Sequence, residues 1–408
     1  MSQLNYLYHS VEPDAFNPNG YSEFDNLDFS IDFSGRSMVA GSVRFEGEIR
    51  VRDNVLPGGN DILDGARVVV DHMIGAHALI QSAVTQTLNH GIIENVTNLP
   101  RLAKMKTSAT KDVNDMCQSD MLCELRSPDK KVQEKLMLRK TPSDIGGGAE
   151  GQANNQQHRG SSFANFVRYS GGVLAVNLPA YENPDFSLKP AIVLNQVVGG
   201  SKLVNYTTTG TIKVSLNLGR TAEVLYGEDV INHAYTIINP RICFVSVPEQ
   251  AKQSPISLRS SVCLKSNIVS TLSNTSNRVP SICDSVSLSF IPLARENNAQ
   301  FNNTALEQLP NVTAVRFMFN DSTNKYVAYE LKNTPEIVAE GLKALATGTA
   351  TNDVRLDKLA ANEGYIAGLK FGEAVDLSKQ KFNIQIASGV QTANPYCMYA
   401  YFHSLVSF

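Results

Sequence analysis

A mainly β protein, built as an antiparallel β-sandwich, is the fold class that this sequence predicts. Strand-like segments recur along the chain, long polar segments connect them, and only two or three segments have a helical pattern. The chain has 408 residues, which is enough for two average domains or one elaborated domain. Its apolar fraction of 42% is sufficient for a hydrophobic core.

The first clear strand is Ser42–Arg52, SVRFEGEIRVR, where apolar residues alternate with charged ones. Period two predicts a strand with one buried and one solvated face. Leu56–Gly59 predicts a turn, and Arg67–Val70 resumes a strand. We expect another strand or a short helix over Ala76–Thr87, and weak helical structure over Thr110–Cys123.

The middle of the chain contains three more predicted strands. Gly210–Leu218, GTIKVSLNL, places its apolar side chains on one face. Phe186–Leu194 precedes it, and Ala234–Val247 follows it with an interruption at Pro240. Glu249–Asp284 is rich in Ser and Asn and is predicted to be irregular.

The C-terminal part predicts a hairpin, because Val315–Phe319 and Tyr326–Leu331 flank residues that favour turns. A helix is predicted from Thr334, which can act as the N-cap, to Gly348, which can end it. Pro335 suits its first turn. The remaining predicted strands are Val286–Phe290, Phe382–Ile386 and Cys397–Phe402.

This pattern indicates a jelly-roll β-sandwich with a few short helices, either a single roll with an insertion or a double roll. The strand count does not decide between them, and no internal repeat stands out. We expect an acidic N-terminal arm over residues 1–35 and jelly-roll strands over 36–250, with a polar insertion near 126–162. Residues 251–408 would form a second β-rich part, either an insertion domain or a second roll with the closing strands.

The charge distribution argues against nucleic-acid binding by the N-terminus. Net charge is −3, and only 18% of residues are charged. Residues 1–35 contain no Lys or Arg, whereas an arm that neutralises phosphates must be cationic. Their acidic residues are Glu12, Asp14, Glu23, Asp25, Asp28 and Asp32. A surface of neutral polar groups suits protein–protein contact, because little charge has to be desolvated there.

Ile145–Gly160, IGGGAEGQANNQQHRG, contains the string GxGxxG at Gly146–Gly151. A dinucleotide loop needs a strand before this string and a helix that begins within it. A turn precedes it here, and the residues that follow have no apolar face, so we expect a flexible surface connection. Serine-hydrolase, zinc-protease and P-loop motifs are absent as well. We therefore predict no catalytic residues, no bound cofactor and no enzyme activity.

Metal binding is also not expected. Asp71, His72 and His77 lie close in sequence, but a spacing of five places the two histidines on different faces of a helix or strand. We expect hydrogen-bonded turn histidines rather than a metal site. The cysteines form no CxxC pair and are expected to be buried free thiols. They are Cys117, Cys123, Cys243, Cys263, Cys283 and Cys397.

Arg101, Lys104, Lys106 and Lys111 form a modest basic cluster. It could contact an anionic partner such as a membrane face or nucleic acid. A solvated face or an ion-pair site between subunits is the more common role of such a cluster. The start of the sequence shows no secretory signal, and no apolar segment reaches membrane-spanning length.

Several segments resemble the jelly-roll capsid proteins of tailless double-stranded DNA viruses. The likeness is greatest to the minor capsid (penton) proteins of virophages and polinton-like viruses. The segments that carry it are RSMVAGSVRFEGEIRV, IGAHALIQSAVTQT, GIIENVTNLPRLAKM, TTGTIKVSLNLGR, AYTIINPRICFVSVP and the terminal YCMYAYFHSLVSF. They cover about half of the chain, and they are strand patterns rather than catalytic signatures.

The resemblance implies a structural virion protein, assembled inside the host cell and located in the capsid. It implies a homo-oligomer, with a pentamer at the icosahedral vertices favoured over a trimer, and contacts with other capsid proteins. An internal membrane is a further possible partner. A double-jelly-roll major capsid protein is the alternative, and a β-sandwich binding module, such as a spike or adhesin, is the alternative from another class.

Overall fold

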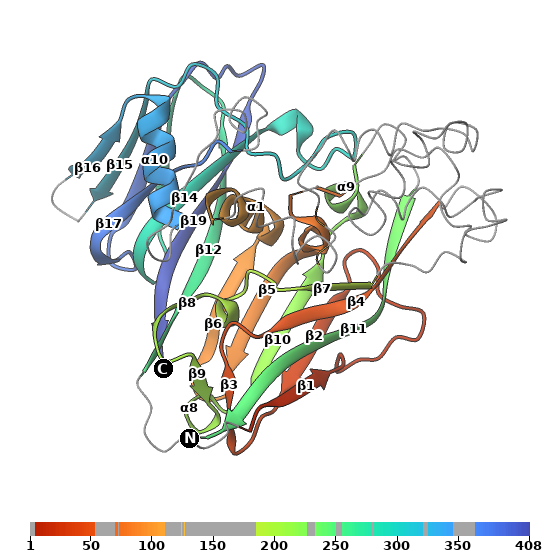
Figure 1. The fold of residues 1–408 in the computed structure, drawn as a ribbon. Coiled ribbons are helices and arrows are strands. Elements are labelled where there is room, and N and C mark those ends of the chain that lie inside the picture. The colour runs from red at the N-terminus through yellow and green to blue at the C-terminus, as the bar shows by residue number, and fades with distance from the viewer. Residues whose placement is uncertain are drawn as a thin grey trace, which may run out of the picture.

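The computed structural model describes residues 5–53, 70–71, 73–110, 124, 126, 185–226, 233–249, 255–279, 281–320, 325–345 and 364–408. In these residues the chain forms two antiparallel β-sandwiches that lie side by side (Figure 1). The first sandwich, roll 1, uses strands before residue 249, and the second, roll 2, uses the strands after residue 255 together with β8, which lies before residue 249. The mainly β prediction is therefore confirmed, and the structure shows a double jelly roll.

The strands of roll 1 form two sheets. One contains β1 (Leu7–Val11), β3 (Arg36–Val39), β4 (Arg44–Asp53), β7 (Asp185–Leu188), β9 (Leu203–Asn205) and β11 (His233–Pro248). The other has the order β2 (Asn26–Ile31), β10 (Ile212–Leu218), β5 (Ile80–Thr87) and β6 (Gly91–Thr97). Phe29 and Phe45 meet edge to face between these sheets, at the centre of the roll 1 core.

Roll 2 repeats the same topology. One sheet has the order β17 (Ala367–Asp376), β14 (Ile282–Pro292), β19 (Tyr396–Ser407), β12 (Ile256–Ile268) and β8 (Val197–Gly200). The other has the order β13 (Leu272–Asn277), β18 (Lys381–Ala387), β15 (Ala314–Asn320) and β16 (Lys325–Leu331). Phe371, Phe382 and Phe402 pack between the two sheets. In each roll the first strand pairs with the last, β1 with β11 and β12 with β19.

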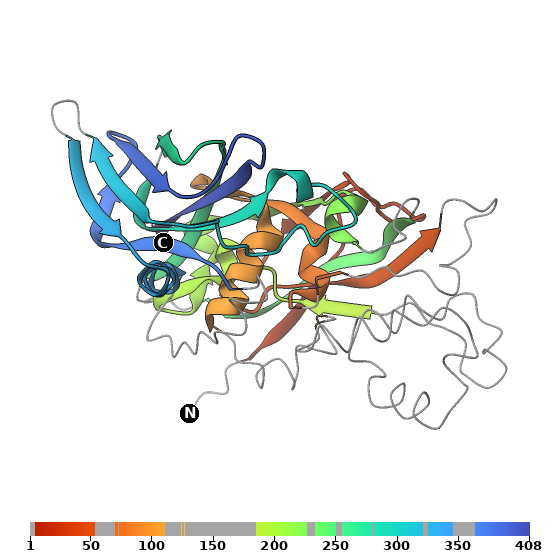
Figure 2. The ribbon, with the colours of Figure 1, turned by 90° about the horizontal axis from the view of Figure 1, so that it is seen from above.

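Each roll has a helix directly after the corresponding edge strand. Helix α1 (Leu99–Thr110) follows β6, and helix α10 (Thr334–Leu345) follows β16. Figure 2 shows α10 among the strands of roll 2 and α1 between α10 and the strands of roll 1. The short helical elements are η1 (Gly75–Leu79), η4 (Val193–Asn195), η5 (Leu293–Arg295), α8 (Tyr206–Thr209) and α9 (Thr221–Val224). None of the described helices has the length and apolarity to cross a membrane.

Most predicted strands of the N-terminal half are present. Strand β4 matches Ser42–Arg52, and β10 matches Gly210–Leu218. Ala76–Thr87 contains both predicted alternatives, because η1 ends where β5 begins. Phe186–Leu194 is a strand only in its first part, over β7.

Four other predictions for this half lie outside the described residues or differ from the structure. The predicted strand Arg67–Val70 and the weakly helical Thr110–Cys123 lie almost entirely outside the described residues, as does the turn Leu56–Gly59. Strand β11 continues through Pro240, and the ladder shifts register between Ile238 and Arg241. The bulge leaves Pro240 out of the ladder, so the missing backbone N–H of proline breaks no hydrogen bond between the strands.

Glu249–Asp284, predicted to be irregular, contains two complete strands and the start of a third. Strand β12 pairs with β19 over its whole length, and β13 pairs with β18. Buried serines such as Ser260 and Ser261 hide the strand pattern, because hydroxyl groups occupy positions where apolar residues are expected. The long ladder with β19 supplies hydrogen-bond partners for the backbone N–H and C=O groups of β12, so the strand forms without a regular alternation of apolar side chains.

The C-terminal hairpin and helix are confirmed as β15, β16 and α10. The cap differs from the prediction, because Oδ1 of Asn333, not Thr334, accepts the Glu336 N–H at 2.9 Å. Gly348 lies outside the described residues. The predicted strands Phe382–Ile386, Cys397–Phe402 and Val286–Phe290 are parts of β18, β19 and β14.

Helix α10 packs closely on its own sheet because it carries Gly341. A Cβ atom at this position would lie 2.3 Å from the carbonyl oxygen of Ile366, just before β17. We predict that Gly341→Ala lowers the free energy of unfolding by about 2 kcal/mol, since backbone must move to admit the methyl group. Urea unfolding would measure this loss. Gly372→Ala is the matched control, because no atom lies within 4 Å of its Cβ position.

Candidate functional site: the joint between the two rolls

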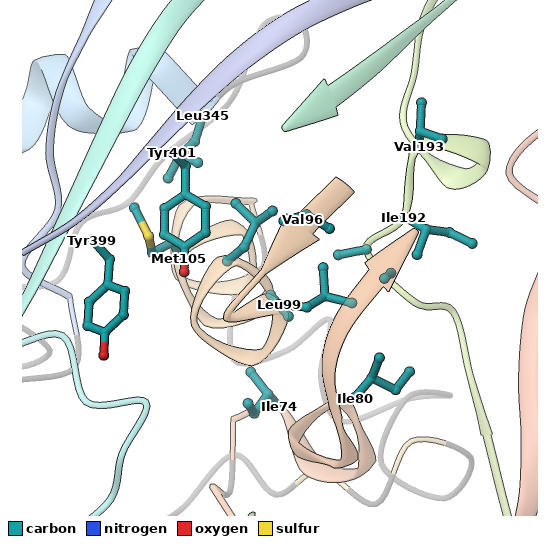
Figure 3. Packing of buried hydrophobic residues seen from close by; sticks show 14 of the residues in the cluster. Ile74, Ile80, Val96, Leu99, Met105, Ile192, Val193, Leu345, Tyr399 and Tyr401 are labelled. Carbon is teal, nitrogen blue, oxygen red and sulfur yellow. The ribbon is translucent and has the colours of Figure 1, made fainter. Parts of the chain in front are cut away.

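The two rolls meet along a buried joint, formed by β6 and α1 of roll 1 and by the outward face of β12 and β19 of roll 2. Figure 3 shows the Tyr401 ring of β19 beside Met105 of α1, with Val96 and Leu99 close by. The Tyr401 hydroxyl donates to the Asn98 carbonyl at 2.8 Å. Polar and apolar contacts therefore both fix the position of one roll on the other.

Arg101, at the start of α1, belongs to this joint. Its side chain is only 3% exposed, and its guanidinium lies 4.5 Å from the centre of the Tyr399 ring. It donates to the carbonyls of Ala305, at 2.7 Å, and Asn303, both in the connection between β14 and β15. A planar guanidinium suits this combination of ring stacking and carbonyl binding.

Lys104 forms a buried ion pair with Asp71. The distance from Nζ to Oδ2 is 2.5 Å, and the side chains are 0% and 2% exposed. Oδ2 also accepts from Asn302 and Thr304 of roll 2, each at 2.6 Å, and Oδ1 accepts the Met73 N–H at 2.8 Å. Roll 2 thus completes the hydrogen bonding of a carboxylate that belongs to roll 1.

The predicted basic cluster is therefore not a solvated face. Arg101 and Lys104 are buried and Lys106 is half-buried, and their partners lie within the same chain. Lys106 donates to Oε1 of Gln196 at 2.8 Å. Lys111 lies outside the described residues. Sequence spacing could not reveal this burial, because the roll 2 groups that cover α1 are distant in sequence; Ala305, for example, is 204 residues from Arg101.

Asp71 and His77 do not meet as a metal site. Arg126 donates to Nε2 of His77 at 2.8 Å and pairs with Glu124 at 2.7 Å. His77 is buried, as expected of a hydrogen-bonded histidine, whereas His72 and the glycine string at Gly146–Gly151 lie outside the described residues. The described residues contain no group of three His, Cys, Asp or Glu side chains that could hold a metal ion.

The described cysteines are free thiols: Cys243, Cys283 and Cys397 are buried, and Cys263 is half-buried. Burial raises the pKa of the Cys263 thiol to about 11 and that of Cys283 to about 11. Such thiols stay protonated near neutral pH and are poor nucleophiles. Cys117 and Cys123 lie outside the described residues.

Arg259 of β12 is a second buried arginine, on the same outward face of roll 2. The Arg259 guanidinium contacts the Ala344 carbonyl at the end of α10, at 2.7 Å, and Asp284 at 3.1 Å. His403 of β19 lies between Ser261 and Ser287, whose hydroxyls are 2.9 and 2.8 Å from its two ring nitrogens. Burial, with the positive charge of Arg259 nearby, lowers the pKa of His403 well below its usual value.

Glu94 of β6 is another buried carboxyl group on the roll 1 side. Oε2 accepts from the Val193 N–H at 2.8 Å and from the Thr85 hydroxyl at 3.2 Å. Burial raises the pKa of Glu94 to about 7, against the effect of these donors and of the Lys106 charge. Burial, with Arg259 nearby, also lowers the pKa of Lys106 to about 7.

A cavity of about 30 Å³ lies in the joint, lined by polar groups that include Gln81, Asn98, Glu223 and Glu296. This volume suits a water molecule rather than a substrate. A larger hollow of about 400 Å³ lies on the outward face of roll 1 beside Glu46, Asp185 and Arg241. The polar groups that line the two sites are ones that form hydrogen bonds and ion pairs.

Searches against protein-family models and curated proteins find no match. Solved structures do match over the whole chain. The Faustovirus major capsid protein aligns with a TM-score of 0.54 and 8% identity, and the alignment covers 100% of this chain and 91% of that chain. A chain of the PBCV-1 virus capsid gives a TM-score of 0.52 and 9% identity, covering 100% and 95%.

A chain in the cryo-EM structure of the Sputnik virophage gives a TM-score of 0.52 and 9% identity, covering 99% of this chain and 86% of that chain. The alignments extend through both rolls, so the shared feature is the complete two-roll architecture. At these identities the comparison shows a common fold.

We predict that removing one partner of the Lys104–Asp71 ion pair is strongly destabilising. Lys104→Met and Asp71→Asn should each lower the free energy of unfolding by about 3 kcal/mol, because each leaves a buried charge without its partner. The double variant should lose less than the sum of the single losses, which urea unfolding would measure. As a control, Lys343→Met removes an exposed pair with Glu340 and should cost under about 1 kcal/mol.

We also predict that Glu94→Gln changes how stability depends on pH. The folded-state pKa is raised, so protonated Glu94 contributes stability that is present below its unfolded pKa of about 4.3 and lost as pH rises through 7. Relative to the native chain, the free energy of unfolding of the variant should rise by about 3 kcal/mol between pH 4 and pH 8. Thermal unfolding across this range is the measurement.

The exposed Glu373→Gln is the matched control and should follow the native pH profile. A Glu94→Gln profile parallel to the native one would show that Glu94 does not titrate in this range.

Proposed function

We propose that this chain is a structural subunit of a virion capsid and that it performs no catalysis. The observation that carries the proposal is the two-roll fold, which aligns over its full length with the Faustovirus major capsid protein. The buried joint supports the proposal, because a shell subunit must keep a fixed shape under load from its neighbours. Arg101 and Asp71 of roll 1 form hydrogen bonds with residues of roll 2 and hold the rolls together.

Among capsid roles, we favour the double-jelly-roll major capsid protein over the minor (penton) protein. The penton resemblance rests on strand patterns in about half of the chain, whereas the fold comparison includes both rolls. Both rolls have the same strand order, with a helix after the same edge strand, so roll 2 is a second roll rather than an insertion between strands of the first. The penton role, with pentamers at vertices, remains the alternative.

The proposed partners are further copies of this chain and other capsid proteins, and the proposed location is the virion capsid after assembly in the host cell. We do not expect the N-terminal arm, residues 1–35, to bind nucleic acid directly. Its acidic residues Asp14 and Asp28 accept hydrogen bonds at the surface of β2 and β10, from Ser30 and Ser215. An internal membrane stays a possible neighbour.

We retain the proposed division of the chain into 1–35, 36–250 and 251–408, with the polar insertion near 126–162. Within it, the N-terminal segment contributes β1 and β2 to roll 1. The last segment holds every strand of roll 2 except β8, so a second roll with its closing strands is the form of this segment that we favour.

A binding module such as a spike or adhesin is the candidate from another class. It would need an aromatic cluster on exposed loops, and two exposed rings, Phe24 and Phe301, have a guanidinium stacked over them. Among the described residues, each of these two rings has one arginine over it and no stacked aromatic neighbour. This arrangement favours the capsid role over glycan recognition.

We predict that the purified full-length chain self-assembles. Mass photometry and negative-stain microscopy should show trimers, the oligomer expected of a major capsid subunit with two rolls in each copy. Pentamers would favour the penton role instead. A stable monomer at micromolar concentration that binds a small ligand would contradict the capsid proposal.

A further inference from the structure

Two side-chain nitrogen atoms from different rolls share one carboxylate oxygen at the joint. Nζ of Lys104, in α1, lies 2.5 Å from Oδ2 of Asp71. Nδ2 of Asn302, in the connection between η5 and β15, donates to the same oxygen atom at 2.6 Å. The amine of roll 1 and the carboxamide of roll 2 are therefore neighbours, although Asn302 is 231 residues from Asp71 in the sequence.

The carboxamide of Asn302 is held in one orientation. Its Oδ1 accepts the Thr304 N–H at 3.0 Å, while its Nδ2 donates to Asp71. The Thr304 hydroxyl lies 2.8 Å from Oδ1 and 2.6 Å from Oδ2 of Asp71, so it can turn from the carboxylate to Oδ1 when negative charge develops there. These two donors polarise the carbonyl group as an oxyanion hole does, and they make Cγ of Asn302 more electrophilic.

Little water reaches this site. Lys104, Asp71 and Thr304 are 0%, 2% and 6% exposed, and Asn302 is half-buried. Arg101, one turn before Lys104 on α1, binds the backbone carbonyls on both sides of Thr304 and holds this segment against the helix. A nucleophile that is fixed beside a carbonyl group has a high effective concentration, and water competes poorly with it here.

We propose that Lys104 and Asn302 form an isopeptide bond that joins the two rolls covalently, with Asp71 as the group that transfers the protons. The Lys104 ammonium gives a proton to Oδ2 of Asp71, and the resulting amine attacks Cγ of Asn302. Asp71 returns this proton to Nδ2 as the Cγ–Nδ2 bond breaks. It then takes a second proton from the attacking nitrogen and passes it to the ammonia, which leaves as ammonium.

The products are a secondary amide and one ammonium ion, and Asp71 ends as the carboxylate that it was at the start. No oxidant or other co-reactant is consumed. The ion pair of Lys104 with Asp71 is the arrangement before the bond forms. The proposal does not depend on the capsid role, because it concerns only groups within one chain.

Asn302 is a better target for the amine than Asp71 itself, because its carboxamide is neutral and the charge of a carboxylate disfavours attack at its carbon. The two possible products differ in mass. A bond from Lys104 to Asn302 releases ammonia, whereas a bond from Lys104 to Asp71 would release water. A folded chain that loses water and carries the second bond would overturn the assignment to Asn302.

Intact-protein mass spectrometry of the folded full-length chain is the test. We expect a mass below that of the sequence by one ammonia. Chain recovered from inclusion bodies in urea and never refolded should keep the full mass, because nothing then holds Lys104 beside Asn302. A native chain that keeps its full mass after prolonged incubation in the folded state would refute the isopeptide bond.

Three variants assign the reacting groups. Asn302→Ala keeps the ion pair of Lys104 with Asp71, and it should show the full mass of its own sequence. Lys104→Arg keeps the positive charge and should also show its full mass. Gln300→Ala removes an exposed carboxamide from the same connection and should still lose one ammonia. Loss of ammonia from the folded Asn302→Ala variant would overturn the proposal.

Peptide mapping places the bond, because succinimide formation at an Asn–Gly pair such as Asn19-Gly20 also releases ammonia. Trypsin should not cut after Lys104 in the cross-linked chain. The digest should contain a branched peptide in which Leu102–Lys106 is joined to Glu296–Arg316. Finding only linear peptides from these two segments would overturn the proposal, even if the intact chain has lost ammonia.

Discussion

The carboxylate of Asp71 is the group on which the relative position of the rolls depends. A charge buried to this extent is tolerated only if a countercharge and several donors surround it. Lys104 supplies the countercharge from roll 1, and Asn302 and Thr304 of roll 2 supply two of the donors. Sliding one roll along the other would break these hydrogen bonds together. An apolar contact would tolerate such a shift more readily, because hydrophobic burial has no direction.

Buried polar side chains lie beside apolar ones at this joint, although the core of each roll is apolar. Arg259 binds a backbone carbonyl oxygen at the end of α10. His403 of β19 bridges two serines, one on each of the strands that flank β19. Such groups specify one geometry, since each donor needs its acceptor at a fixed distance and angle. The apolar contacts of Tyr401 and Met105 add free energy of burial to that specificity.

The sequence was most informative for strands and helices that have one buried face and one face exposed to solvent. The alternation in β4 and β10 and the apolar face of α10 are local signals, and the predictions there are confirmed. Strand β12 was missed because both of its faces are covered and serines occupy part of them. The burial of Arg101 and Lys104 has a similar origin, since their partners come from a distant segment.

Strand β8 belongs by sequence to the first half of the chain, yet it extends the sheet of roll 2 by pairing with β12. During synthesis Val197–Gly200 emerges long before Ile256–Leu258, its partner in the ladder. Roll 1 can close when β11 reaches β1, while β8 must wait for the next strand of the chain. Roll 2 is therefore attached to roll 1 from its first strand, and it is completed last, when β19 pairs with β12.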